Sequence, residues 1–151
     1  MADIQEKLGT ATAMTITLAS LADDAARQST EVDNTTNLFF SATIAVKVKT
    51  DTPSSPTGIH VYLFGNVNDL RDDGCGASDA AATVVNAVKL GTIAAAEAAT
   101  TYIRTFDTAA AWPGGLPAKW GIIVLNETGH TLDSTGGNHS VYYQGIYAQS
   151  A

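Results

Sequence analysis

Hydrophobic and polar residues alternate with a period of two along several stretches of the chain. The clearest stretch runs from Leu38 to Val48, where alternate positions place one set of apolar side chains on one face: Leu38, Phe40, Ala42, Ile44, Val46 and Val48. Successive side chains of a strand point to opposite faces, whereas a helix would scatter this set around its cylinder. The pattern therefore predicts a strand with one face in a core. The other face, with Phe39, Ala45 and Lys47, is only weakly polar, and we expect a loop or a second subunit to cover it.

Other segments show related patterns and bring the expected total to about eight strands. These segments are Met14–Leu18, Ile59–Val67, Thr83–Ile93, Thr100–Phe106, Lys119–Asn126 and Asn138–Gln149, with Arg27–Val32 as a further edge strand. The run Lys119–Asn126 is almost continuously apolar, which is typical of a central strand buried on both faces. No segment predicts a long helix. We therefore predict an all-β chain in which residues 10–151 form a single jelly-roll-like antiparallel β-sandwich.

Residues 1–9 are expected to form an N-terminal arm. Ile4 and Leu8 are spaced i, i+4, which allows a short helical turn that Gly9 would end. An arm of this length gains little stability by itself, and such segments often pack on a neighbouring subunit. Ile4 and Leu8 are therefore candidate partner-binding residues.

Two loops are further candidates for contacts with a partner. The loop from Asn66 to Ala81 is rich in Asp and Gly and contains Asp69, Asp72 and Asp73, and loops of this length are usually functional or contact-making. Its carboxylates lack the alternate-position register of a calcium loop, so we expect a solvated loop and no metal or other cofactor. The loop from Ala109 to Pro117 carries Trp112 and Leu116.

The tryptophans and the tyrosines of the last strand allow more than one interpretation. We expect Trp120, inside the predicted central strand, to belong to the core. Trp112 could either contact a partner or anchor its own loop. If it were exposed together with Tyr142, Tyr143 and Tyr147, these rings could form a sugar-stacking platform or an interface hot spot.

The charge of the chain narrows the choice of partners and location. The formal net charge is −7, and the eight Lys and Arg residues are scattered without forming a basic stripe. Binding to nucleic-acid phosphates or to an anionic membrane is therefore not expected. The segment MADIQEKLG has no apolar signal-peptide region, and the single cysteine, Cys75, cannot form an internal disulfide. These features fit synthesis in a reducing cytoplasm.

No familiar catalytic constellation is present in the sequence. The three histidines, His60, His130 and His139, are not spaced as zinc ligands with one another or with Cys75. The chain has no Gly-x-Ser-x-Gly nucleophile elbow and no Lys-Ser/Thr phosphate loop. Asp72 and Asp73 lie beside Cys75, and acidic neighbours raise the pKa of a thiol, which weakens it as a nucleophile. We therefore expect a protein that is not an enzyme.

Several segments together resemble a group of bacteriophage proteins. They are Leu18–Ala22, Arg27–Ser29, Val32–Thr35, Val61–Gly65, Asp73–Asp79, Leu116–Gly121, Asn126–Gly129 and Val141–Gly145. In these segments the chain resembles the jelly-roll decoration, or cement, proteins of tailed bacteriophage capsids, and the likeness spans most of residues 10–149.

This resemblance implies a virion protein on the outer capsid surface, made in the cytoplasm of a bacterial host. It implies a homo-dimer or homo-trimer that bridges copies of the major capsid protein and stabilises the shell. Two alternatives stay open at this point. One is a jelly-roll protein of the phage tail, baseplate or fibre, and the other is a carbohydrate-binding module that uses Trp112 and the strand tyrosines.

Overall fold

The computed structural model describes residues 3–54 and 58–150, so the first two residues of the expected arm and the last residue of the expected domain lie outside the described residues. The strands are β1 (Ile4–Leu8), β2 (Thr12–Met14), β3 (Ala26–Gln28), β4 (Val32–Asp33), β5 (Ser41–Lys49), β6 (Gly58–Val67), β7 (Leu70–Arg71), β8 (Ala80–Ala82), β9 (Val88–Ile93), β10 (Thr101–Asp107), β11 (Lys119–Glu127) and β12 (Ser140–Ser150). Single 3-10 turns occupy η1 (Asp72–Gly74), η2 (Thr108–Ala110) and η3 (Gly136–Asn138).

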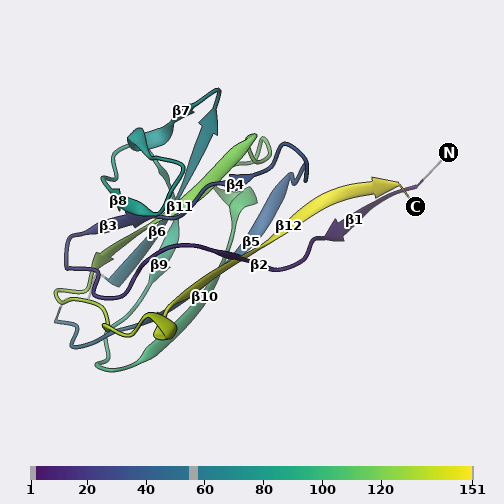
Figure 1. The fold of residues 1–151 in the computed structure, drawn as a ribbon. Coiled ribbons are helices and arrows are strands. Elements are labelled where there is room, and N and C mark those ends of the chain that lie inside the picture. The colour runs from purple at the N-terminus through teal and green to yellow at the C-terminus, as the bar shows by residue number, and fades with distance from the viewer. Residues whose placement is uncertain (1–2, 55–57, 151) are drawn as a thin grey trace.

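The strands form two antiparallel sheets that pack against each other (Figure 1). One sheet has the order β1-β12-β5-β10, and β2 also pairs with β12. The second has the order β7-β6-β11-β3-β8, with β4 on β11 and β9 on β6. If β1 with β2 and β3 with β4 are each taken as one interrupted strand, and β7 and β8 as additions, eight strands remain. The first then pairs with the eighth, the second with the seventh, the third with the sixth and the fourth with the fifth.

This pairing scheme is that of a jelly roll, in which a long folded hairpin is wrapped into two sheets. It is carried by β12 on β1 and β2, by β11 on β3 and β4, by β5 on β10, and by β6 on β9. The predicted jelly-roll-like β-sandwich is therefore confirmed, with twelve strands among the described residues where about eight were expected. The long strand β11 lies in the middle of the second sheet, and the long strand β12 is an inner strand of the first.

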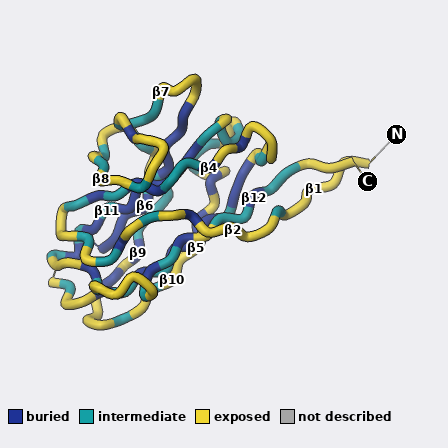
Figure 2. Tube along the Cα trace, viewed as in Figure 1, coloured by how far each residue is buried: buried dark blue, intermediate teal, exposed yellow. Residues whose placement is uncertain are grey.

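The main core lies between the sheets. The inward side chains of β5 are Ala42, Ile44, Val46 and Val48, and all of them are fully buried, as the alternation predicts. Trp120 is fully buried in this core, which confirms the expectation for that residue. A second, smaller cluster of Ala26, Phe64, Cys75 and Ile123 lies on the other face of β6 and β11. It explains why β11 is buried on both faces, as its apolar run predicts (Figure 2).

Four local predictions are wrong. Of the expected strand Met14–Leu18 only Met14 lies in a strand, because the pairing of β2 with β12 ends at Met14. Leu38 and Phe40 do not belong to the buried face, because β5 begins only at Ser41 and the two side chains are 73% and 39% exposed. The expected edge strand Arg27–Val32 is divided between β3 and β4, and β3 is not at the edge, because β8 pairs with its outer side. Ile4–Leu8 is a strand and not a helical turn, because its backbone pairs with β12 over its whole length.

Candidate functional site

The first and last strands form a two-stranded ribbon, here called the arm, that projects from the sandwich and carries both chain ends at its tip (Figure 1). It consists of β1 and the last five residues of β12, paired from Leu8–Ile146 to Ile4–Ser150. All five residues of β1 are exposed, with Ile4 at 78% and Leu8 at 63%. A two-stranded ribbon alone is only marginally stable in water, and this one leaves the apolar side chains of Ile4 and Leu8 exposed.

Aromatic rings fix the base of the arm to the core. Trp120 lies edge-on to Tyr143 at 5.4 Å between ring centroids, and Phe39 lies 6.4 Å from Tyr143 and 6.1 Å from Tyr147. Gly145 makes room for this row, because a Cβ atom there would collide with the Phe39 ring. The contacts in this row of rings, from the core residue Trp120 to Tyr147, therefore fix the orientation of the arm relative to the sandwich.

A groove lies beside the base of the arm. It has a volume of about 350 Å³ and is lined by Asn34, Thr35, Leu38, Phe39, Phe40, Gly115, Leu116 and Ala118. Leu116 is half-buried, and its backbone N–H donates to the Phe40 carbonyl at 3.2 Å, which joins the two walls. We call this feature, with its exposed residues Leu38 and Phe40, the apolar groove.

Asn34 holds the apolar groove in shape. Its side chain is buried, donates from Nδ2 to the carbonyls of Phe39, Leu116 and Pro117 at 2.9–3.4 Å, and accepts from the Phe39 N–H at 2.8 Å. Leu38 lies in the middle of this turn with φ +54°, a left-handed conformation that costs a leucine about 1–2 kcal/mol. This conformation therefore lowers the stability of the folded chain while it exposes the apolar side chain of Leu38 to solvent. Strained backbone positions of this kind concentrate at functional sites.

The segment Asn66–Ala81, predicted as a loop, contains the end of β6, all of β7 and η1, and the start of β8, and its aspartates bind their own chain. Asp72 accepts from the Gly65 N–H at 2.9 Å, and Asp73 accepts from the N–H groups of Val85, Asn86 and Ala87 at 2.6–2.9 Å. Burial would raise the pKa of Asp73, but the three backbone donors outweigh it and leave that pKa below its ordinary value. Both carboxylates therefore stabilise this segment through hydrogen bonds to backbone N–H groups of the same chain.

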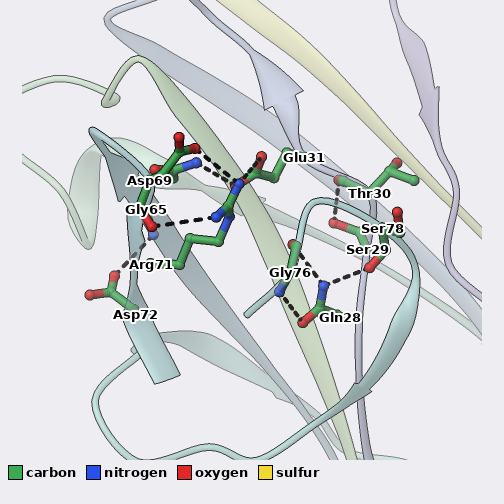
Figure 3. A network of polar contacts seen from close by, with 11 residues as sticks. Gln28, Ser29, Thr30, Glu31, Gly65, Asp69, Arg71, Asp72, Gly76 and Ser78 are labelled. Atoms are coloured by element: carbon green, nitrogen blue, oxygen red, sulfur yellow. Dashed lines mark hydrogen bonds and ion pairs between the residues drawn. The ribbon is translucent and has the colours of Figure 1, made fainter. Parts of the chain in front are cut away.

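Asp69 belongs to a neighbouring ion-pair network (Figure 3). Arg71 donates to Asp69 at 3.3 Å and to the buried carboxylate of Glu31 at 2.7 Å, and Asn66 donates to the same Glu31 oxygen. In residues 3–54 and 58–150, no group of three or more His, Cys, Asp or Glu side chains is placed to hold a metal ion. The Asp side chains are thus separate from the arm, and the proposal that they contact a partner stays a prediction.

Trp112 anchors its loop. The ring packs against the main core and covers Gly65, where a Cβ atom would collide with it. Of the two interpretations that the sequence left open for Trp112, loop anchoring is the one that the geometry supports. A ring held in this way offers little free face for stacking on a sugar.

One hydrogen-bonded Thr–His–Glu group lies on the outer side of the second sheet. His60 is buried, and its Nδ1 lies 2.7 Å from Thr92 Oγ1 while its Nε2 lies 2.7 Å from Glu127 Oε2. The hollow that includes Glu127 is lined by neither His60 nor Thr92, so the hydroxyl does not face a substrate-sized space there. The group satisfies both nitrogens of a packed histidine.

Cys75 is a buried thiol, and burial is the main cause that raises its pKa to about 11, with Asp73 and Asp72 adding to it. Because only the thiolate reacts with iodoacetamide, we expect the folded chain at pH 8.5 to be alkylated about 100-fold more slowly than the urea-unfolded chain. Mass spectrometry of timed samples measures this. Equal rates in both states would show that the thiol is neither buried nor perturbed.

The sequence signal for this site was partial. Ile4, Leu8 and Leu116 were candidate contacts and lie on the arm and in the apolar groove. Leu38 and Phe40 were assigned to the core, and Asn34 was not singled out. One sequence signal could have identified these residues: Asn34 precedes the apolar run that begins at Leu38. Asn side chains often form hydrogen bonds with nearby backbone groups and so stabilise turns.

The sequence matches no protein-family model, and no curated protein matches it either. Within the described part of the chain, no helix is long and apolar enough to cross a membrane.

Proposed function

We propose that this chain is a structural protein of a bacteriophage virion, a capsid decoration protein that binds the outer surface of the major capsid protein and stabilises the shell. The observation that carries the proposal is the apolar groove beside the arm, in which an exposed leucine is held in a strained backbone. The resemblance of the sequence to decoration proteins and the jelly-roll fold support the same assignment.

The proposed mechanism is multivalent clamping. The groove of each copy receives an apolar side chain of the capsid protein between Leu38, Phe40 and Leu116. Many copies bind one symmetric shell, so their small individual binding free energies add up. The net charge of −7 suits a position on the outside of the shell, away from the packaged DNA. The arm, with Ile4 and Leu8, contacts either the capsid or a neighbouring copy.

The structure is compatible with one of the two alternative functions and disfavours the other. A tail, baseplate or fibre protein could use the same groove, so the place of the protein in the particle separates that alternative from a capsid role. A carbohydrate-binding module is disfavoured, because Trp112 packs over Gly65 and Trp120 is buried, which leaves neither tryptophan as an open platform.

The proposal is tested by binding to particles assembled in cells from which the gene for this chain has been deleted. Purified full-length protein is expected to co-sediment with these particles, and a Leu38→Ser/Leu116→Ser double variant is expected to bind at least about 30-fold more weakly, as for the loss of an interface hot spot. Val85→Ser is the matched control, because Val85 is as exposed as Leu38 but lies far along the chain between β8 and β9.

Circular dichroism of each variant checks that the fold is retained. Particle binding that is lost with the double variant and kept with Val85→Ser would support the apolar groove as the contact. Absence of the protein from wild-type particles, or equal binding of all three chains, would refute the proposal.

A further inference from the structure

A second hollow, here called the aromatic hollow, lies at the base of the arm. It has a volume of about 370 Å³, and its aromatic lining consists of Phe39, Tyr143 and Tyr147. Of the residues that line the apolar groove, only Phe39 also lines this hollow. Ligand sites have volumes from about 300 Å³ upward, so this volume is sufficient for a small molecule.

The rings of the aromatic hollow are half-buried and do not stack on one another. Phe39 meets Tyr143 edge-on, with 64° between the ring planes, and meets Tyr147 at 50°. Tyr143 meets Trp120 edge-on at 81°. Because each of these contacts is edge-on or tilted, no ring lies flat against another, and the rings keep face area for a ligand.

Hydroxyl and amide groups lie around the rings. Thr10 and Thr12 come from the link between β1 and β2 and from β2 itself, and Thr36 and Asn37 come from the turn after β4. In residues 3–54 and 58–150, the hydroxyls of Thr10, Thr36 and both tyrosines have no hydrogen-bond partner. Asn37 uses only its Nδ2, which donates to the Asp33 carbonyl. The free hydroxyls can both donate and accept, and the Asn37 Oδ1 can accept.

The lining of the aromatic hollow is uncharged. The chain has 15 acidic and 8 basic residues, but none of them is among the described residues that line this hollow. An anionic ligand would find no cation there and would be repelled by the net charge of −7, and a cationic ligand would find no carboxylate. The lining therefore favours an uncharged ligand with many hydroxyl groups.

Hydrogen bonds hold the aromatic hollow in shape without a ligand. The Gly9 N–H donates to the Gly145 carbonyl at 2.8 Å, and Gln144 Nε2 donates to the Gly9 carbonyl at 3.0 Å, which ties the link after β1 to β12. Asn34 bonds to the N–H and to the carbonyl of Phe39, whose ring lies against Gly145. A preformed site of this kind lowers the cost of binding, because little has to be ordered when the ligand arrives.

We propose that the aromatic hollow binds a neutral saccharide through one pyranose ring. A pyranose carries C–H groups on its ring faces and hydroxyls around its edge. The C–H groups pack on the faces of Phe39 and Tyr147. The sugar hydroxyls exchange hydrogen bonds with the hydroxyls of Thr10 and Thr36 and with Asn37 Oδ1.

This site is separate from the two earlier functional arguments. It uses neither tryptophan, so the packing that disfavours a sugar platform built on the tryptophans does not affect it. It also does not depend on the assignment to a virion, because the capsid contact is proposed for the apolar groove, and sugar binding follows from a different lining.

Saturation-transfer difference NMR of the full-length chain tests the proposal, with glucose, galactose, N-acetylglucosamine and rhamnose as neutral probes. At least one of these sugars is expected to bind with a dissociation constant in the millimolar range and to receive saturation from the aromatic protons of the protein, most strongly at C–H protons of one ring face. Glucuronate, which differs from glucose by a carboxylate, should give weaker transfer than every neutral sugar that binds.

Three variants locate the binding. Tyr147→Ala should raise the dissociation constant of the sugar at least about tenfold, because it removes a ring of the lining. Thr36→Val keeps the shape of an exposed side chain but removes a free hydroxyl, and it should raise the constant about threefold to tenfold. Tyr142→Ala is the matched control, because it removes the same side chain from the same strand but outside the lining, and it should leave the constant unchanged.

Circular dichroism of each variant checks the fold, and Thr36→Val decides the case if Tyr147→Ala does not fold. Absence of transfer to all of the neutral sugars, or transfer to glucuronate alone, would overturn the proposal. So would wild-type binding by the folded Tyr147→Ala and Thr36→Val variants, or an equal loss in Tyr142→Ala.

Discussion

A Trp120→Ala variant is expected to lose about 3–5 kcal/mol of unfolding free energy, the largest effect of any substitution considered for this chain. Trp120 is the largest fully buried side chain, and its ring supports Tyr143 at the start of the aromatic row that leads to the arm. Truncation leaves a cavity between the sheets that the neighbouring strands cannot fill. Urea unfolding followed by far-UV circular dichroism measures the loss.

Trp120→Phe is the control that separates packing from polarity. The indole N–H of Trp120 is buried and has no hydrogen-bond partner in the described residues, so removing it leaves no acceptor unsatisfied. We expect Trp120→Phe to lose only about 1–1.5 kcal/mol, as for other hydrophobic replacements in a core. A Phe variant as unstable as the Ala variant would mean that the indole nitrogen makes an essential bond.

The second large effect is expected for Asn34→Ala, at about 2–3 kcal/mol. The substitution leaves the N–H of Phe39 and the carbonyls of Leu116 and Pro117 without their partner in a half-buried turn. The Leu38 N–H keeps its bond to the Asn34 backbone carbonyl, but the neighbouring residue Phe39 loses both of its bonds to the Asn34 side chain, so the groove should open locally. Hydrogen exchange measured by mass spectrometry is expected to rise in peptides covering 34–40 and 116–118.

Asn37→Ala provides the comparison, because Asn37 lies in the same turn but is exposed and makes one side-chain bond, to the Asp33 carbonyl. It should change stability by less than about 0.5 kcal/mol. If both variants behaved alike, Asn34 would not be the residue that builds the groove.

Period-two alternation was sufficient to predict the interior of the sandwich. Ile44, Val46 and the run around Ile122 are buried where the pattern places them, because in a sandwich the inward face of a strand is decided by its own sequence. The pattern failed at the ends of elements. Leu38 and Phe40 continue the alternation of β5, but the hydrogen bonds of Asn34 turn the chain away before Ser41.

The interaction surface was harder to predict, because it depends on pairing between distant parts of the chain. The spacing of Ile4 and Leu8 suits a helical turn, and only the backbone of β12, more than 130 residues later, makes this segment a strand. The same pairing sets which face of the arm is apolar. Leu116 and Leu38 lie far apart in sequence, and their segments meet because Asn34 bonds to both and the Leu116 N–H donates to the Phe40 carbonyl.

The central claim is that this chain binds a phage capsid through the apolar groove, and cryo-electron microscopy of particles that contain the chain tests it most directly. We expect jelly-roll density on the outer capsid surface, with Leu38 and Leu116 against the major capsid protein. Density at the tail, or a capsid-bound jelly roll whose groove faces solvent, would contradict it.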